Sequence, residues 1–292
     1  MMLKKCLTVI TLCMVMFSCK KDQDVLETPI QTENAISASD PELSNTLSDE
    51  INEKPTNTSI PLICVDKITD SKPMILGEDE DIDGKGVFIK GTKWANGKTL
   101  KVFFMNGSDY LRGKVFTYAQ RWSNYANIKF VLTKNKAESD IRVGFKINGN
   151  TGSWSYFGTD AREYRAGRQT MNFGWFDRNT SDLELIRTTV HEFGHALGLA
   201  HEHKSPVNTI QWDRPAVYAY YMGPPNNWTR EEVNDQVLNK YKPRDVRNTK
   251  YDPESIMHYY IDPDLTLNHV GVGYNLKLSD KDKIFIARIY PK

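Results

Sequence analysis

Three of the six histidines in this chain have the spacing of metal ligands. The stretch from His191 to His201 reads HEFGHALGLAH. In a helix, His191 and His195 are four residues apart and lie on one face, so both imidazoles can reach one metal ion. Gly198 can adopt the backbone conformation that ends a helix, and that turn could bring His201 round as a third ligand. The spacing predicts a catalytic zinc site, because three protein ligands leave one position open for water.

The residue after the first histidine, Glu192, is the expected general base. It is placed to act on a metal-bound water rather than to bind the metal. Zinc lowers the pKa of its bound water to ~7, so hydroxide is available near neutrality. Glu192 would take the proton and pass it to the leaving amine. The predicted chemistry is hydrolysis, with one zinc ion per chain.

A helix over 183–197 must position these groups. Ser181 or Asp182 is the expected N-cap, and apolar residues spaced three and four apart form a stripe that faces the core. The stripe comprises Leu183, Ile186, Val190, Phe193 and Leu197.

The elements around this helix predict an α+β fold. A helix from Ser108 or Asp109 to about Tyr125 lies between expected strands, which indicates a crossover and a mixed sheet. The polar stretch 202–252 is expected to be loop-rich, with a short helix at 230–239, and Ser279 caps a last helix. Strands are expected up to Phe104 and over 128–132, 141–145, 152–158 and 169–175, and the last helix over 280–290.

The N-terminus has the pattern of an export signal. Lys4 and Lys5 precede an apolar run of about a dozen residues, too short to span a bilayer, which needs ~20. A small residue before Cys19 resembles a bacterial lipoprotein signal, which would make Cys19 the lipidated first residue of the exported chain; the alternative is an ordinary secretory signal. We expect an outer-membrane or cell-surface lipoprotein, or a secreted protein, whose only membrane contact is the lipid anchor.

Four segments follow from composition. Residues 1–19 form the signal and 20–58, polar and poor in aromatics, a disordered tether. Residues 59–88 form a propeptide-like segment and 89–292 the catalytic domain. Outside the signal, Cys64 is the only cysteine, so the catalytic domain contains no disulfide. The formal net charge of +1 indicates no polyanionic partner, so we expect no nucleic-acid binding. We also expect a monomer.

A second motif, Ser255-Ile256-Met257-His258-Tyr259, makes the resemblance to a known family specific. With the HExxHxxGxxH stretch and Glu202 directly after it, the chain resembles the astacin family of the metzincin metalloendopeptidases, over about residues 90–292. Eukaryotic astacins carry disulfides, and this chain has Ser153 where they usually have a cysteine, so bacterial relatives are the better comparison. The implied fold is a twisted mixed sheet with an active-site helix, and a C-terminal subdomain with a methionine turn and a final helix.

The resemblance also implies roles for single residues. Met257 would form a hydrophobic floor under the metal, and Tyr259 would be a switchable fifth zinc ligand that donates to the oxyanion when substrate binds. Glu202 would anchor the amino terminus freed by processing. The edge strand that pairs with an extended substrate would comprise Trp154, Ser155, Tyr156 and Phe157. The implied function is a zinc endopeptidase acting on proteins and peptides.

The sequence leaves alternatives for how the precursor is kept inactive and for which substrates it prefers. The aspartate motif of astacin propeptides is absent, so Cys64 as a zinc-bound thiolate, or Glu78 or Asp79, would hold the precursor inactive; alternatively Cys64 is only a small buried residue. No arginine lies between Tyr259 and Arg288, so the resemblance does not imply a preference for acidic residues after the scissile bond. Two other functions are conceivable: an inactive zinc-binding surface lipoprotein, and a narrow-specificity metzincin of another branch.

Overall fold

The computed structural model describes residues 63–67, 86–164, 167–224 and 226–292. All of them lie in the second of two units of the chain, residues 59–292. The predicted signal, Cys19, the tether 20–58 and the acidic residues Glu78 and Asp79 lie outside the described residues. Among the described helices, none is long and apolar enough to cross a membrane.

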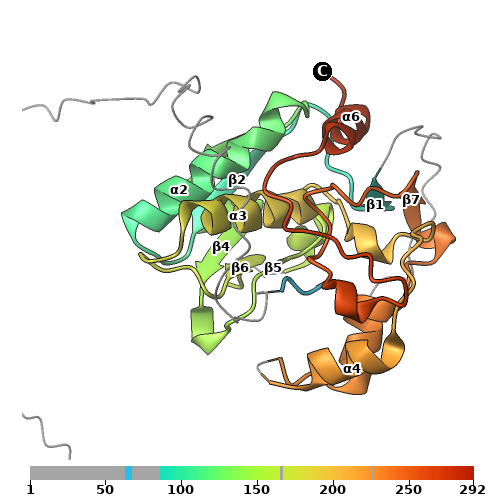
Figure 1. Cartoon of the computed structure of the whole chain (residues 1–292). Coiled ribbons are helices and arrows are strands. Elements are labelled where there is room, and N and C mark those ends of the chain that lie inside the picture. Colours follow the sequence, from blue (N-terminus) through green and yellow to red (C-terminus); the bar gives the residue numbers. More distant parts are fainter. Residues whose placement is uncertain (1–62, 68–85, 165–166, 225) are drawn as a thin grey trace, which may run out of the picture. The chain divides into compact units, whose positions relative to one another are not determined.

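A five-stranded sheet in the order β3-β2-β4-β6-β5 forms one layer of the fold (Figure 1). Four strands run parallel, and β5 is antiparallel to β6 at the edge, so the predicted mixed sheet is confirmed. A separate antiparallel pair joins β1 to β7. The strands are β1 Val87–Ile89, β2 Thr99–Phe104, β3 Lys129–Leu132, β4 Ile141–Phe145, β5 Trp154–Ser155, β6 Met171–Phe173 and β7 Val246–Asn248.

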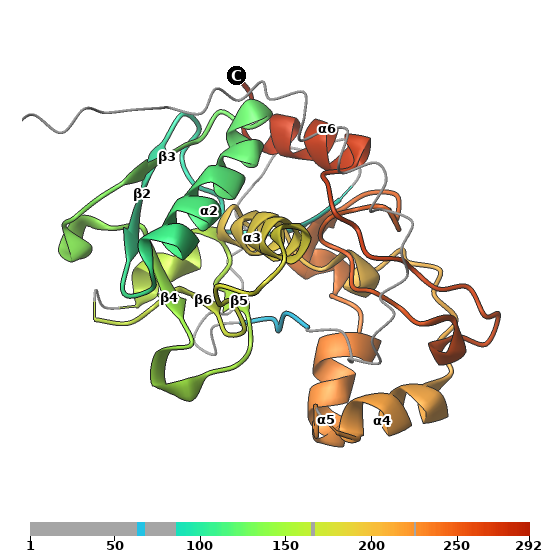
Figure 2. The same ribbon diagram turned by 60° about the vertical axis from the view of Figure 1, so that its left-hand side comes forward.

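The helices of the described chain include two that lie side by side over the sheet, α2 and α3 (Figures 1 and 2). Short 3-10 turns connect several elements, and a π-helical turn, Asn234–Leu238, continues α5. The α-helices are α2 Asp109–Ala119, α3 Asp182–Ala196, α4 Arg214–Met222, α5 Arg230–Val233 and α6 Asp280–Ile289.

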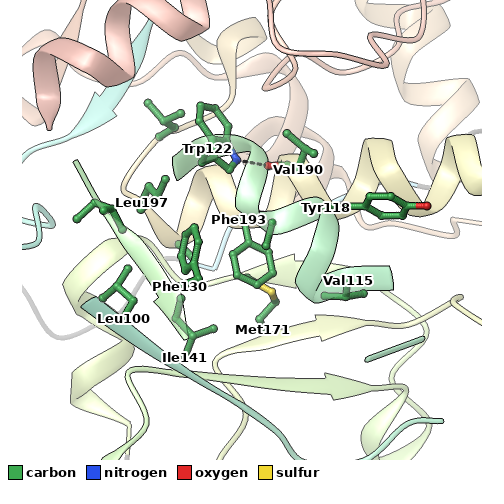
Figure 3. Packing of buried hydrophobic residues seen from close by; sticks show 14 of the residues in the cluster. Leu100, Val115, Tyr118, Trp122, Phe130, Ile141, Met171, Val190, Phe193 and Leu197 are labelled. Atoms are coloured by element: carbon green, nitrogen blue, oxygen red, sulfur yellow. Dashed lines mark hydrogen bonds between the residues drawn. The ribbon is translucent and has the colours of Figure 1, made fainter. Parts of the chain in front are cut away.

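Large apolar side chains lock α3 against α2 and the sheet (Figure 3). The indole of Trp122 donates to the carbonyl of Val190 at 2.8 Å, and Phe193 meets Phe130 edge to face. Four of the five predicted stripe residues of α3 are buried, and Leu183, in the first turn, is half-buried. The N-cap is Ser181, whose hydroxyl accepts from the amide of Glu184. Helix α3, which carries His191 and His195, is therefore held in a densely packed core.

The sequence prediction missed one α-helix within 202–252. Helix α4 occupies part of this stretch, with Asp213 as N-cap and Pro215 in its first turn. Val217 and Tyr221, four residues apart, bury one face of α4 in a second small core. The helix predicted over 230–239 is confirmed as α5 and its π-helical continuation.

The strand predicted over 152–158 is shorter than expected. Only Trp154–Ser155 is strand, because Gly158 adopts a left-handed conformation and begins a 3-10 helix. A Cβ at Gly158 would lie 1.9 Å from the carbonyl oxygen of Thr92, so the close approach requires glycine. The regular part of the edge strand β5 is therefore only two residues long.

The last helix begins as predicted. Ser279 caps α6 and forms a reciprocal capping box with Asp282. Phe285 and Ile289 are buried, whereas Ile284 is exposed. Asp282 also accepts from the hydroxyl of Ser255 and the amide of Ile256, which ties α6 to the methionine turn.

Candidate active site

Three imidazoles converge on one point beside α3. The Nε2 atoms of His191 and His195 each lie 3.1 Å from Nε2 of His201. His191 and His195 come from successive turns of α3, and His201 follows Gly198, whose φ of +96° turns the chain back. A Cβ at Gly198 would lie 2.4 Å from Phe88, so the turn needs a glycine for its conformation and for space.

The opposite ring nitrogens fix the tautomers. Nδ1 of His191 lies 2.7 Å from the carbonyl oxygen of Ile256, and Nδ1 of His195 lies 2.8 Å from that of Leu199. Nδ1 of His201 lies 2.7 Å from a carboxylate oxygen of Asp66. The Nδ1 atoms of His191 and His195 face carbonyl oxygens, which can only accept, so both carry the proton and their Nε2 atoms present lone pairs. The carboxylate beside Nδ1 of His201 favours the same tautomer. Burial, followed by the imidazole of His201, lowers the pKa of His195 to about 3, which also favours the neutral ring.

A fourth donor lies beside the three imidazoles. Sγ of Cys64 lies 3.5 Å from Nε2 of His195, and the four donor atoms lie within 4.8 Å of one another. Zinc–nitrogen bonds of about 2.0–2.1 Å and a zinc–sulfur bond of about 2.3 Å imply N···N and S···N distances of about 3.3 and 3.5–3.6 Å in a tetrahedron. The lone pair of His201 faces those of His191 and His195 at 3.1 Å, and such lone pairs repel unless a cation lies between them, so this donor set fits zinc.

Met257 lies directly beneath the helix that carries the first two histidines. A Cβ at Gly194 would lie 2.4 Å from its sulfur and 3.0 Å from the ring of Trp122. Met257 is buried, and its carbonyl accepts from the amide of Glu202 at 3.0 Å. The methionine turn therefore packs against α3 at Gly194, between His191 and His195.

Glu192 is completely buried beside the four donors. Its carboxylate faces the thiol of Cys64, and neither oxygen accepts a hydrogen bond from a nitrogen or hydroxyl group of the described chain. Burial raises the pKa of Glu192 to about 8. A small pocket next to it is lined by Cys64, Trp175, Arg187, Thr188 and His191.

Tyr259 lies on the other side of the cysteine. Its hydroxyl donates to the carbonyl oxygen of Cys64, and its ring stacks on His203 at 4.0 Å between centroids. His203 is held in turn by the carbonyl of Gln236, at 2.9 Å from Nε2. The tyrosine hydroxyl is thus aimed at a backbone carbonyl in the cleft.

The segment 63–67 lies along the edge strand. Cys64 pairs with Ser153 and Lys67 with Tyr156, both in the parallel sense, and the amide of Val65 donates to the carbonyl of Ser153 at 3.3 Å. Among the predicted edge residues, Trp154, Ser155 and Phe157 are buried and Tyr156 is half-buried. The edge predicted to hold a substrate is therefore covered by the chain itself.

The predicted anchor residue, Glu202, is buried close to other acids. One of its oxygens accepts from the amide of Asp252 at 2.8 Å. Burial, and then the nearby carboxylates of Asp282 and Asp252, raise its pKa to about 8. The strand β1 begins nearby: Val87 accepts from the amide of Ala200, two residues before Glu202.

Sequence reasoning missed four residues of the site. The carboxylate of Asp66 accepts from Lys204 and Tyr241. The only sign of this role in the sequence was that Asp66 comes two residues after Cys64, which places both side chains on one face of an extended chain. Arg187 lines the pocket next to Tyr259 and His191, so a cationic group does lie there. It comes from α3 and not from the stretch between Tyr259 and Arg288, where the sequence has no arginine.

Comparison with known proteins agrees with this geometry. Residues 88–263, more than half of the chain, match the peptidase family described as Astacin. The structure of myroilysin is similar with a TM-score of 0.68 and 47% identity, covering 71% of this chain and 99% of that one. Karilysin from Tannerella forsythia is 28% identical over 154 residues, and the tolloid protein of Drosophila melanogaster, a dorsal-ventral patterning protein, 29% over 182.

Coverage of the two curated relatives is uneven. The matches cover 46% and 58% of this chain but only 30% and 15% of karilysin and tolloid, so the chain spans less than a third of either. The family match itself spans β1 to the methionine turn and includes all three histidines of the site. The chain belongs to the astacin family of zinc metalloendopeptidases.

Proposed function

We propose that this chain is a latent zinc endopeptidase that hydrolyses peptide bonds in proteins once its segment around Cys64 has left the cleft. The observation that carries the proposal is the convergence of three Nε2 atoms, with an oxygen atom within 2.8 Å of each Nδ1. His191, His195 and His201 would hold the zinc ion. Bound zinc would polarise a water molecule and the scissile carbonyl.

Glu192 supplies the proton transfer in this proposal. Its buried carboxylate lies beside the position that Cys64 sulfur occupies, where an attacking water would be placed. It takes a proton from the attacking water and delivers it to the leaving amine. The removal of Cys64 would open the space for that water.

Tyr259 stabilises the developing negative charge. Its hydroxyl already donates to the carbonyl of Cys64, which supports the idea that it would donate to a substrate carbonyl at the same place. Donors of this kind contribute about 3–4 kcal/mol each to transition-state stabilisation. Stacking on His203 limits the motion of the ring.

Cys64 accounts for latency. Its thiolate would occupy the position that water needs, and its segment covers the edge strand where a substrate would pair. Burial, and then the carboxylate of Glu192, raise the pKa of the thiol well above its usual value, so only a bound metal would keep it ionised. Zinc therefore stabilises the segment in the cleft.

Processing and location complete the proposal. An amino terminus freed near β1 would bring an ammonium group toward Glu202, whose buried carboxylate has no cationic partner of its own in the described ion pairs. The N-terminal pattern suggests export, with Cys19 as the lipid attachment point in an outer-membrane or cell-surface protein. A lipid anchor would be the only membrane contact.

A casein or gelatin assay tests the function. The purified precursor is cleaved by limited proteolysis and freed from the released segment; we expect hydrolysis that a zinc chelator abolishes and added zinc restores. Glu192→Gln, treated in the same way, should keep one zinc per chain and lose nearly all activity. Near-wild-type activity of Glu192→Gln would contradict the mechanism, and an inactive wild type with zinc bound would favour a non-catalytic zinc protein.

A further inference from the structure

The side chain of Asp66 lies in a polar cage between its own segment, 63–67, and the rest of the described chain. Its Oδ2 lies 2.7 Å from the ammonium nitrogen of Lys204 and accepts from the hydroxyl of Tyr241 at 2.7 Å, and its Oδ1 faces His201. The side chains of Asp66 and Lys204 are 1% and 5% exposed. The pair is thus almost fully withdrawn from water.

The cage is built from two parts of the chain, only one of which would leave on activation. Asp66 belongs to the segment that covers the cleft, whereas Lys204 and Tyr241 belong to the catalytic domain. Among the ion pairs of the described residues, Lys204 has no carboxylate partner besides Asp66. The ammonium lies over the ring of Tyr241, 4.6 Å from its centroid, which holds the chain in place.

Loss of the segment would leave a cation without a partner on the cleft floor. A buried charge whose partner is removed is costly, and it regains stability by binding another anion. Lys204 and Tyr241 would then offer an ammonium and a hydroxyl donor to one carboxylate, in the arrangement that now holds Asp66.

We propose that Lys204 and Tyr241 form a subsite for an acidic side chain of the substrate, and that Asp66 fills this subsite in the latent chain. The inference rests on the proposed function, since it assumes that the segment leaves and a substrate takes its place. Asp66 is two residues from Cys64, and in an extended chain both side chains point to the same face. A substrate side chain near the zinc on that face meets Lys204.

Arg187 is the other cation near the cleft, and it is a weaker candidate. It lines the pocket next to Tyr259, but its guanidinium already makes two bonds to Glu184, at 2.8 and 2.9 Å. Both residues belong to α3, so this pair persists when the segment leaves. After the segment leaves, Arg187 would still be paired with Glu184, whereas Lys204 would have lost Asp66.

The first test measures binding without catalysis. A synthetic peptide of residues 61–69 is titrated calorimetrically into the processed, zinc-loaded chain, beside the same peptide with Asp66→Asn. We expect the asparagine peptide to bind about 10- to 100-fold more weakly. With Lys204→Gln the two peptides should bind equally, which is the signature of a direct pair.

A matched control uses a second lysine. Lys240 is exposed and donates to the carbonyl of Asn208 at 2.8 Å, away from Asp66. Lys240→Gln should therefore keep the full difference between the two peptides. An undiminished difference in Lys204→Gln, or equal binding of both peptides to the wild type, would overturn the subsite. Failure of both peptides to bind would instead count against the proposed latency.

The second test uses substrates. Fluorogenic peptides carry one aspartate or one asparagine at each position around the cleavage site, and kcat/KM is compared pairwise. We expect one position with about a tenfold or greater preference for aspartate, absent in Lys204→Gln and kept in Lys240→Gln. If no position prefers aspartate over asparagine, the assignment is wrong. It is also wrong if the preference for aspartate disappears in Arg187→Gln but persists in Lys204→Gln. If no peptide is cleaved, the proposed function fails, not the subsite alone.

Discussion

Replacing Cys64 by serine should convert the latent precursor into a partly active one without cutting the chain. The substitution removes the sulfur that lies 3.5 Å from His195 and leaves the segment its other contacts. Those contacts include the donation from Tyr259 to the carbonyl of residue 64 and the ion pair between Asp66 and Lys204. The segment is then held in the cleft by fewer bonds.

The magnitude follows from the share of one ligand in a four-ligand zinc site. Structural zinc sites contribute about 10–16 kcal/mol in total, or roughly 2.5–4 kcal/mol for each of four ligands. Since 1.4 kcal/mol is a factor of ten, losing the sulfur raises the open fraction of the precursor by about 10²–10³. The remaining hydrogen bonds keep that fraction below one.

The assay is the initial rate on a fluorogenic peptide with intact precursor, compared with the wild-type precursor and the processed enzyme. Mass spectrometry before and after the measurement checks that the chain is uncut. A Glu192→Gln change in the Cys64→Ser background should abolish the new activity, which excludes a contaminating protease. If uncut Cys64→Ser precursor stays as silent as wild type while its processed form is fully active, the cysteine does not hold the enzyme latent.

Three further substitutions test the parts around the metal. In the processed enzyme, Tyr259→Phe should lower kcat by about 10²–10³ while the chain retains zinc, and an unchanged kcat would leave the tyrosine a packing role. Gly194→Ala places a Cβ 2.4 Å from the sulfur of Met257 and should lower the free energy of unfolding by about 1–3 kcal/mol in a denaturant titration; an unchanged midpoint would refute the close packing. Asp282→Ala leaves three donors without their acceptor, two at the methionine turn and the amide of Ser279, and should lower the free energy of unfolding by about 2–5 kcal/mol, whereas a loss below about 1 kcal/mol would show that water replaces the carboxylate.

The sequence contained the metal site because the site is local. Two histidines one helical turn apart and a third beyond Gly198 need only a helix and a turn, and both follow from short-range patterns. The stripe from Ile186 to Leu197 predicted how α3 would be buried for the same reason. Helix α4 was missed because its two buried residues, Val217 and Tyr221, sit among other aromatic residues that hide the periodicity.

Contacts between distant parts of the chain were beyond the sequence. Asp66 meets Lys204 and Tyr241 across 138 and 175 residues, and no local pattern relates them. The end of strand β5 depends on Gly158 meeting the backbone at Thr92, again a tertiary contact. Cys64 was a candidate because it is the only cysteine outside the signal, but its distance from His195 is a property of the fold alone.

X-ray absorption at the zinc edge of the intact precursor tests most directly whether Cys64 is the fourth zinc ligand of the latent chain. A latent chain with the predicted ligands should show three nitrogen neighbours at about 2.0–2.1 Å and one sulfur neighbour at about 2.3 Å, and the processed chain should lose the sulfur. A zinc shell of oxygen and nitrogen alone in the precursor, or a sulfur neighbour that persists after the segment is removed, would contradict the account.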